Sequence, residues 1–555
     1  MGAVVAALAQ CQDALARESG ALGDGYVSAF PSSLLDRFEA SEPVWAPLYT
    51  LHKVLAGLLD VHELLPDLDG NLDGNLDGNL DGDLNGKLDG APSAPDGAPA
   101  GADSQPGTRT STSVADEDDE EGDEDGARAG SAALRIALRF AAYAELRAER
   151  SIAARGLDGH FGSLNMEYGG WNDFVWRLAQ LTGDARWRRL GSLYDKPCFL
   201  ADRAAPDPAA IDAPALHPLA GLHANAHLPI VLGALRRHGV TGEAHFERLG
   251  RRLFRTLNSA HAYATGGTSH AEVWGRPHAQ AETVERTAPV GVEHQETCST
   301  YNHLKLADAL LHSHAHAPVA DVAERALLNG VLGTMRALEP GALLYFLPLG
   351  ANVSKAAAQA WRLSGWAAPH GDFWCCSGTG VENFARLADR VWLEATSTPP
   401  APSVHGTPAP LTRRALLVSQ FVPSAVRWLP GASEAEVAAA QAAPTAPTEL
   451  LRARLDEAAP LGAERTHRVT VTVEYASESG QRCSGDGRRG AADAGDVELA
   501  IRVPGWAHAA ALGAEPRRPA LRLNGALVDI DWRALAAQDG AHGGAHGGAH
   551  GGAHG

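Results

Sequence analysis

Two segments of the chain carry residues that could bind a metal ion or act as nucleophiles. In the first, FWCCSGTG (373–380), Cys375 and Cys376 stand side by side. Adjacent cysteines are poor partners for each other, because closing a disulfide between neighbours strains the intervening peptide. Two thiolates that converge on a third group explain the pair better.

The second segment, GVEHQETCSTYNHLKLADALL (291–311), places Glu296 and Cys298 two residues apart, just before a helical pattern. Together with Cys375 and Cys376 they supply one carboxylate and three thiolates, a set that suits tetrahedral zinc. The open alternative is that the cysteines are simply small buried residues. The usual CxxC spacing of zinc sites is absent here.

Three further residues are candidates for catalysis or ligand binding. Glu272 lies in a Gly-rich, aromatic-flanked stretch, TGGTSHAEVWGRP, where a side chain can meet a ligand. His52 falls among the apolar positions of a predicted helix, and Glu324 falls in the helical pattern AERALLNG. Taken alone, these residues could equally be a solvated loop carboxylate, a satisfied core histidine and a solvated helix face.

The composition narrows the class of protein. A chain of 555 residues has room for two or three domains. Residues 67–128 hold 18 acidic and 3 basic side chains, so this segment carries most of the net charge of −20. The remainder is close to neutral and offers no basic face for a nucleic acid. No apolar run is long enough to span a membrane, and six cysteines make no disulfide framework.

The N-terminal part alternates between helical and low-complexity sequence. Residues 1–65 are predicted to be helical, and YTLHKVLAGLLDVHELL (49–65) shows apolar residues at helical intervals. The first twenty residues resemble an amphipathic helix rather than a signal peptide, and the compartment stays unknown. Residues 66–128, with a four-residue Leu-Asp-Gly-Asn repeat, are predicted to be a disordered acidic insertion. Calcium binding by the repeat is the alternative, but an EF-hand needs a twelve-residue loop.

The rest of the chain divides into a helical part and a strand-rich part. Residues 129–395 show successive helical segments, and LTGDARW is predicted to end one helix at Gly183 and to start the next at an Asp cap. Residues 396–535 carry short β-branched runs typical of an antiparallel sheet domain, interrupted by inserts at 431–448 and 477–495. Residues 536–555 form an Ala/His/Gly tail whose histidines could hold metal loosely.

Seven motifs occur in the order seen in glycoside hydrolase family 127. They are AFPSSLLDRFEASEPVWAPLYTLHKVLAGLLD, SLNMEYGGWNDFVWRLAQLTGD, HANAHLPIVLGAL, TGGTSHAEVW, ETCSTYNHLKL, YFLPLGANVSKA and FWCCSGTGVENFARLAD. The chain most resembles the plant-type, β-L-arabinofuranosidase-like branch of that family. The resemblance covers nearly all of 1–65 and 131–395, and more loosely the strands that end at IRVPGWA.

The resemblance implies a mainly α fold, an (α/α)6 barrel followed by a β-sandwich domain. It implies a Zn²⁺ ion and a zinc-bound cysteine as the nucleophile of a retaining glycosidase. Carried over to this sequence, the metal ligands are Glu296, Cys298, Cys375 and Cys376, the nucleophile is Cys375 and the acid/base is Glu272. The implied sugar contacts are His52, His227 (with His223 as competitor), Glu324 and Tyr345.

This assignment explains the paired cysteines chemically, because a metal-bound thiolate stays deprotonated and nucleophilic at neutral pH. A retaining mechanism places nucleophile and acid/base roughly 5 Å apart. By analogy the substrate is a β-L-arabinofuranoside of a glycoprotein or cell-wall glycan, and the family suggests a secretory or extracellular location. The sequon Asn352–Ser354 would fit that location but is weak support.

The chain departs from the family in length. It begins inside the expected first helices, and its strands stop near Trp532, so we expect missing N-terminal helices and an incomplete sandwich. Two alternatives to the cysteine glycosidase stay open. One is a carboxylate enzyme that pairs Glu272 with Glu324 or Asp173 and keeps zinc as a structural ion. The other is a sugar-binding protein without turnover, in which the acidic insertion is the working part.

Overall fold

The computed structural model describes most of the helical part and the strands of the second part. The described residues are 1–19, 24–65, 118–166, 168–200, 219–287, 293–314, 316–336, 339, 341–355, 359–360, 363–364, 366–367, 374–397, 413–428, 450–458, 468–476, 498–502, 521–523 and 526–528. The Leu-Asp-Gly-Asn repeat, the inserts at 431–448 and 477–495 and the Ala/His/Gly tail lie outside them. No helix among these residues is long and apolar enough to cross a membrane.

The chain divides into two compact units. The first contains Met1–Ser313 and Arg325–Arg386, and the second contains His314–Glu324 and Leu387–Gly555. The sequence places its domain boundary after residue 395, whereas the structural division falls after Arg386 and assigns a short helical stretch to the second unit.

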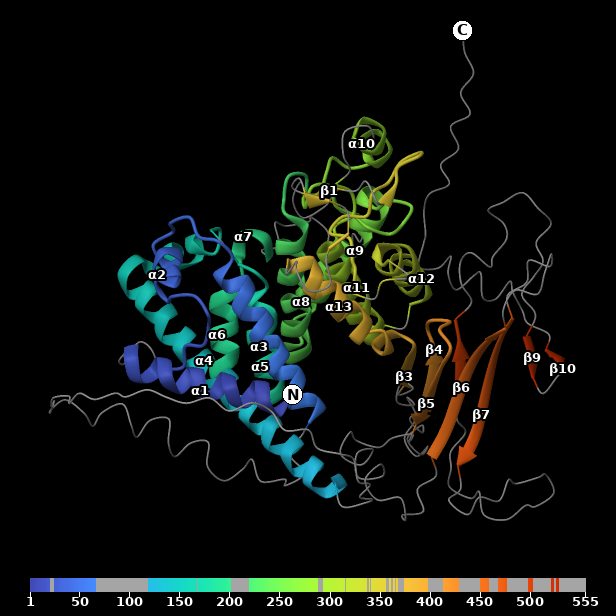
Figure 1. The fold of residues 1–555 in the computed structure, drawn as a ribbon, viewed down its shortest axis with the longest axis horizontal. Helices are drawn as coiled ribbons and strands as arrows, with labels where there is room; N and C mark the ends of the chain where they lie inside the picture. The colour runs from blue at the N-terminus through green and yellow to red at the C-terminus, as the bar shows by residue number, and fades with distance from the viewer. Residues whose placement is uncertain are drawn as a thin grey trace, which may run out of the picture. The chain divides into compact units, whose positions relative to one another are not determined.

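The first unit is helical, as the sequence predicts, apart from the short strands β1 (Gln359–Ala360) and β2 (Leu363–Ser364) (Figure 1). Two π-helical turns, Leu257–His261 and Ala326–Val331, extend helices α9 and α12. The described helices of this unit are α1 (Gly2–Ser19), α2 (Ser33–Glu39), α3 (Pro47–Leu64), α4 (Asp118–Ser163), α5 (Trp171–Thr182), α6 (Ala185–Tyr194), α7 (Pro197–Leu200), α8 (Ala224–Thr241), α9 (Ala244–Thr256), α10 (Gln280–Thr287), α11 (Thr297–Ser313) and α13 (Cys375–Ala385).

Local sequence signals explain where α5 and α6 begin and end. α5 buries Trp171, Phe174, Val175 and Leu178, which share one face at helical spacing. Gly183 ends the helix with a φ of 69°, a left-handed conformation that glycine adopts without strain. The Asp184 side chain then accepts a hydrogen bond from the backbone N–H of Arg186 and caps α6. The predicted break between these helices is confirmed.

Helices that do not follow one another in the chain are neighbours in the first unit. α3 packs on α5, α5 on α8, α8 on α11 and α11 on α13. An ion pair between Lys53 of α3 and Glu382 of α13, with Nζ 3.0 Å from Oε2, links the last of these helices to the first. This neighbour order is the one expected of the inner helices of an α/α barrel, whose six-pair count stays a prediction.

The long helix α4 corrects one predicted boundary. It begins at Asp118, inside the segment 66–128 that the sequence predicts to be disordered. Further along α4, Gly130 lies against the end of α3, since a Cβ atom at this position would meet the Leu65 carbonyl oxygen at 1.9 Å.

The second unit contains strands in several sheets, which Figure 1 shows in orange to red. β5, β6 and β7 form one antiparallel sheet, β9 and β10 form a hairpin pair, and β3, β4 and β8 form a third sheet. The elements are α12 (Ala317–Arg325, all but its last residue), β3 (Trp392–Ser397), β4 (Arg413–Val418), β5 (Ser424–Trp428), β6 (Leu450–Ala458), β7 (Arg468–Ala476), β8 (Glu498–Ile501), β9 (Leu521–Leu523) and β10 (Ala526–Val528).

The parallel pairing of β4 with β8 departs from the antiparallel sheet domain that the sequence predicts. These two strands run parallel, with Ala415 opposite Glu498 and Val418 opposite Ile501. Parallel neighbours need a long crossover connection, and the chain between them supplies one that includes β5, β6 and β7. The strand-rich character of this part of the chain is as predicted.

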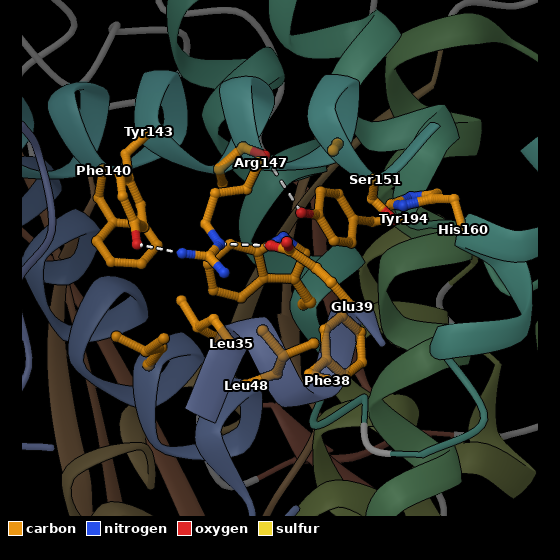
Figure 2. Close-up of a pocket in the computed structure, with 14 residues that line it drawn as sticks. Leu35, Phe38, Glu39, Leu48, Phe140, Tyr143, Arg147, Ser151, His160 and Tyr194 are labelled. Carbon is orange, nitrogen blue, oxygen red and sulfur yellow. Dashed lines mark hydrogen bonds and ion pairs between the residues drawn. The ribbon is translucent and has the colours of Figure 1, made fainter. Parts of the chain in front are cut away.

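A small cavity between α2, α3, α4 and α5 is lined mainly by apolar and aromatic side chains (Figure 2). Its volume of about 20 Å³ is enough for about one water molecule. Arg147 lines it, donates to the Tyr143 hydroxyl at 2.8 Å and forms an ion pair with Glu39. None of the residues that line this cavity has a predicted role in chemistry, so the cavity belongs to the structural core.

Candidate active site

Three cysteine side chains lie at the N-terminal ends of two neighbouring helices. Cys375 and Cys376 are the first two residues of α13, and Cys298 is the second residue of α11. The N-terminus of a helix carries a partial positive charge from its free backbone N–H groups, which favours a thiolate over a thiol. The local fold thus places all three sulfurs where the helix ends favour negative charge.

The structure brings together the four residues that the resemblance implies as metal ligands. The ligand atoms of Glu296, Cys298, Cys375 and Cys376 all lie within 4.8 Å of one another. Sγ of Cys376 is 3.3 Å from Sγ of Cys298 and 3.9 Å from Oε1 of Glu296. All but Cys375 are buried, and Cys375 is partly exposed.

The electrostatics of this cluster single out Cys375. Hydrogen bonds from Cys298 and Cys376 lower its pKa to about 3. Burial raises the pKa of Glu296 and of the Cys298 and Cys376 thiols well above their usual ranges. Glu296, Cys298 and Cys376 thus hold their protons beside the Cys375 thiolate unless a cation offsets the charge of the cluster. A donor set of three sulfurs and one carboxylate fits a thiophilic divalent ion such as zinc.

Glu272 projects from a backbone of unusual conformation. Ala271 and Glu272 have φ angles of 46° and 67°, in the left-handed region that residues with a side chain seldom adopt. Such conformations concentrate at functional sites. The carboxylate accepts a hydrogen bond from the Tyr345 hydroxyl at 2.5 Å, and its other oxygen lies 3.5 Å from Nε2 of His223. Burial alone would raise the pKa of Glu272, but the hydrogen bonds from His223 and Tyr345 outweigh it and lower the pKa.

Tyr345 links the carboxylate to the cysteine cluster. Its hydroxyl lies 2.5 Å from Oε1 of Glu272 and 3.3 Å from Sγ of Cys375. The two reactive atoms are therefore at most about 6 Å apart, which is compatible with the spacing of about 5 Å in retaining glycosidases. One buried side chain thus contacts both predicted catalytic residues.

The structure separates the roles of the two histidines that compete for one predicted sugar contact. His223 is the residue that contacts Glu272. His227 lies one turn further along α8, where Nδ1 is 2.8 Å from the carbonyl oxygen of His223 and the ring packs against Phe199 at 5.0 Å. Burial lowers the pKa of His227 to about 4, so its imidazole is neutral at pH 7.

His52 is buried on α3, and its Nδ1 has no hydrogen-bond partner among the described residues. Its ring meets Tyr49 edge-on at a centroid distance of 5.3 Å. Burial lowers the pKa of His52 to about 3, which keeps the ring neutral. The unpaired Nδ1 is itself buried, and the sugar contact of His52 stays a prediction.

Two other carboxylates that the sequence analysis considered form ion pairs with basic side chains. Glu324 belongs to the second unit, where it forms an ion pair with Arg502. Asp173 forms ion pairs with Arg236 and Lys305. Neither is among the residues that the structure gathers around Glu272, so nothing favours the carboxylate-pair alternative. The sugar contact predicted for Glu324 stays a prediction.

Two hydroxyl residues that the sequence analysis missed also contact the cluster. Ser299 donates to Oε2 of Glu296 at 2.5 Å, and Oγ1 of Thr379 lies 3.1 Å from Sγ of Cys298. Ser299 follows Cys298 directly, and Thr379 follows Cys375 by one helical turn. Helical spacing from the cysteines could have pointed to Thr379.

Comparison with known proteins identifies the class to which this site and its helical unit belong. The family described as "Beta-L-arabinofuranosidase, GH127 catalytic domain" matches residues 1–67 and 128–389. More than half of the chain is matched, and the match omits the acidic segment between residues 67 and 128. The chain belongs to glycoside hydrolase family 127.

Solved structures similar to this chain include other members of that family. A GH127 beta-arabinofuranosidase is 16% identical with a TM-score of 0.43, over 73% of this chain and 54% of its own. A protein titled glycoside hydrolase is 14% identical with a TM-score of 0.45, over 73% and 58%. Ara127N-Se, a GH127 β-L-arabinofuranosidase from Geobacillus stearothermophilus T6, is 15% identical with a TM-score of 0.43, over 96% and 76%.

The chain thus spans about half the length of the first two of these structures. No curated protein matches the chain. The family assignment accordingly depends on the family match over the helical unit.

Proposed function

We propose that this chain is a retaining glycoside hydrolase that releases L-arabinofuranose from β-L-arabinofuranosides. Cys375 is the nucleophile and Glu272 is the acid/base in this proposal. The observation that carries it is the contact of one hydroxyl, that of Tyr345, with both the Glu272 carboxylate and the Cys375 sulfur. This arrangement supports a two-step displacement with both reactive groups beside one anomeric carbon.

Cys375 is the best placed of the three clustered cysteines to act as nucleophile. It is partly exposed, whereas Cys298 and Cys376 are buried. It is also the cysteine whose thiolate form is favoured by the hydrogen bonds around it. A substrate can reach its sulfur, and the other two sulfurs are left to hold a metal ion.

The proposed metal ligands are Glu296, Cys298, Cys375 and Cys376. A bound zinc ion would keep these thiols deprotonated and fix the direction of their sulfurs. The bond-making and proton-transfer steps of the reaction are carried out by Cys375 and Glu272.

In the first step, Sγ of Cys375 forms a bond to the anomeric carbon while the bond from that carbon to the leaving oxygen breaks. Glu272 gives its proton to the leaving oxygen. In the second step, Glu272 takes a proton from water, the water oxygen bonds to the anomeric carbon and the carbon–sulfur bond breaks. The product keeps the configuration of the substrate, because each step inverts it once.

Glu272 needs a proton before the first step, although its pKa is lowered in the free enzyme. A sugar bound beside Glu272 removes water and competes for the hydrogen bonds from His223 and Tyr345. Both changes raise the pKa of the carboxyl. Before the second step, Glu272 is again a carboxylate that these two residues stabilise, which is the form that activates water.

The substrate class is proposed from the family. By analogy, the aglycone is a hydroxyproline-rich glycoprotein or a cell-wall glycan, and such a substrate fits a secreted enzyme of the plant-type branch. The neutral imidazoles of His52 and His227 suit uncharged sugar hydroxyls rather than anionic groups.

The proposal is tested with 4-nitrophenyl β-L-arabinofuranoside and purified full-length protein. We expect release of nitrophenol, with β-L-arabinofuranose as the first product in an NMR time course. Cys375→Ser should lower kcat by about a thousandfold or more, because an alcohol is a far weaker nucleophile at neutral pH.

The control is Cys11→Ser, which changes the exposed cysteine of α1 and should leave kcat at the wild-type value. Wild-type rates in Cys375→Ser would exclude Cys375 as the nucleophile. A product that first appears in the inverted α configuration would exclude the retaining mechanism.

A further inference from the structure

Three hydroxyl groups surround the Glu296 and cysteine cluster, and each contacts a different ligand atom. Ser299 donates to Glu296, and the Tyr345 hydroxyl lies near Cys375. The third is Thr379, which lies near Cys298. Tyr345 also contacts Glu272, so it is part of the proposed reaction centre. Thr379 has no part in the proposed reaction.

Thr379 joins the two helices that carry the cysteines. It is on α13, one turn after Cys375, and its Oγ1 lies 3.1 Å from Sγ of Cys298 on α11. The same Oγ1 lies 3.3 Å from the backbone carbonyl oxygen of Cys375. Thr379 is 1% exposed and Cys298 is fully buried, so water does not compete for this contact.

The threonine side chain is fixed before any ligand binds. A β-branched side chain has few rotamers in a helix, and the contact with the carbonyl oxygen of Cys375 selects one of them. In that rotamer, the hydroxyl can donate to the sulfur of Cys298. A hydrogen bond to a charged sulfur is stronger than one to a carbonyl oxygen, so the proton turns to Cys298 once that residue is a thiolate.

We propose that Thr379 is a positioning residue of the metal site. Its hydroxyl donates a hydrogen bond to the Cys298 thiolate, fixes the direction of that sulfur and increases the affinity of the cluster for zinc. This inference rests on the metal site of the proposed function. It concerns a residue that touches neither the metal nor the sugar.

A second hydroxyl holds another buried metal ligand in the same way as Thr379 holds Cys298. Ser299 holds Oε2 of Glu296, which leaves Oε1 toward Cys376. Partners of this kind, which orient metal ligands, typically change metal affinity by about 10- to 100-fold. Thr379 is the sharper test of the two, because valine has the same shape as threonine and lacks only the hydroxyl.

The test compares zinc affinity in full-length wild type, Thr379→Val and Thr379→Ser, measured by competition with a chromophoric chelator. We expect Thr379→Val to bind zinc about tenfold more weakly, and Thr379→Ser to stay within about twofold of wild type, because serine keeps the hydroxyl. Thr334→Val is the matched control. It removes an equally buried hydroxyl that donates to the carbonyl of Val331.

Cobalt(II) substitution gives a second readout that packing alone does not change. A hydrogen bond to a thiolate lowers the energy of its sulfur electrons. Its loss in Thr379→Val should therefore move the sulfur-to-cobalt charge-transfer band to longer wavelength. Thr379→Ser and Thr334→Val should keep the wild-type band.

Wild-type zinc affinity and an unshifted band in Thr379→Val would overturn the inference. Equal weakening in Thr379→Val and Thr379→Ser would also overturn it, because the methyl group and not the hydroxyl would then matter. If Thr379→Val does not fold, as judged by circular dichroism of the metal-free protein, Thr379→Ala takes its place. A wild-type protein that takes up neither zinc nor cobalt would instead refute the proposed metal site.

Discussion

Arg502 of the second unit forms an ion pair with Glu324, and the same guanidinium pairs with Asp321 one turn earlier on α12. The Arg502 side chain is only 4% exposed. It anchors α12 within its unit, beside β4 and β8, because Arg502 also donates to the carbonyl of Ser419 directly after β4. A buried cation with two carboxylate partners is expensive to disrupt.

Arg502→Met is therefore expected to destabilise the second unit by about 3 kcal/mol, because two partly buried carboxylates lose their cation. Thermal unfolding measures this effect as a lower melting temperature. Arg336→Met, which breaks the exposed ion pair with Glu339, should change it little. An unchanged melting temperature in Arg502→Met would contradict the prediction.

Glu324→Gln distinguishes the ion pair from the sugar contact implied by the family resemblance. We expect a lower melting temperature and an unchanged KM, because Glu324 is engaged by Arg502. An increased KM at an unchanged melting temperature would instead assign Glu324 to the substrate.

Glu272→Gln should slow the enzyme most for substrates with poor leaving groups. Glutamine cannot protonate the leaving oxygen, so alkyl arabinofuranosides should lose about a hundredfold or more in kcat/KM, and a nitrophenyl arabinofuranoside should lose less. Steady-state kinetics over a series of aglycones measures this difference. Glu282→Gln, in an exposed ion pair with Arg276, is the control. Equal losses for all aglycones would refute the role of Glu272 as the acid.

Purified protein without residues 536–555 should contain about one zinc ion per chain by elemental analysis. The tail is removed because its histidines could hold metal. Cys298→Ala should lower this content sharply, because it removes one ligand of a buried site, whereas Cys11→Ala should not. Strong chelators should remove zinc and lower the melting temperature together, because metal binding and local folding are linked. A folded protein without zinc would exclude the metal site.

The burial of Lys305, which its ion pair with Asp173 only partly offsets, makes the stability of the protein depend on pH in the alkaline range. Lys305 Nζ is 3.4 Å from Oδ2 of Asp173, and its side chain is 17% exposed. Burial lowers the pKa of Lys305 to about 8, against about 10.4 in an unfolded chain. Between these values the unfolded chain binds one more proton than the folded protein. The contribution of Lys305 to the free energy of unfolding therefore increases with pH in this window.

The free energy of unfolding of wild type, relative to Lys305→Met, should thus increase by about 3 kcal/mol between pH 7.5 and pH 10.5. Urea unfolding of both proteins across this range measures it. The same comparison with Lys355→Met, at an exposed lysine, gives the baseline. A difference that stays constant, or decreases, with pH would contradict the prediction.

Local signals in the sequence predict much of the fold. The break at Gly183 and Asp184 depends on two neighbouring residues, so it could be read directly. The parallel pairing of β4 with β8 could not, because a strand's sequence does not reveal which distant strand lies beside it. The helical start at Asp118 was hidden because its acidic composition also matches a disordered segment.

Some features of the candidate site could likewise be predicted from the sequence, and others needed the structure. Residue type and family resemblance suffice to choose Cys298 and Cys375. The contact between Tyr345 and Glu272 joins segments far apart in the chain, so it needed the structure. The contact of His223 with Glu272 also needed the structure, because it depends on where α8 begins, and the choice of His227 or His223 as the sugar contact stays a prediction.

The contact between Leu65 and Gly130 has a consequence for protein engineering. Leu65 directly follows α3, and Gly130 of α4 lies against the carbonyl oxygen of Leu65. A guest domain whose own termini lie close together could therefore replace the sequence between these two residues, the first turns of α4 included, because it would join the same two points. The entropy of closing a loop grows only slowly with its length, so a long guest costs little more than a short linker. Leu65 and Gly130 thus mark a position at which a reporter or targeting domain could be inserted into this enzyme.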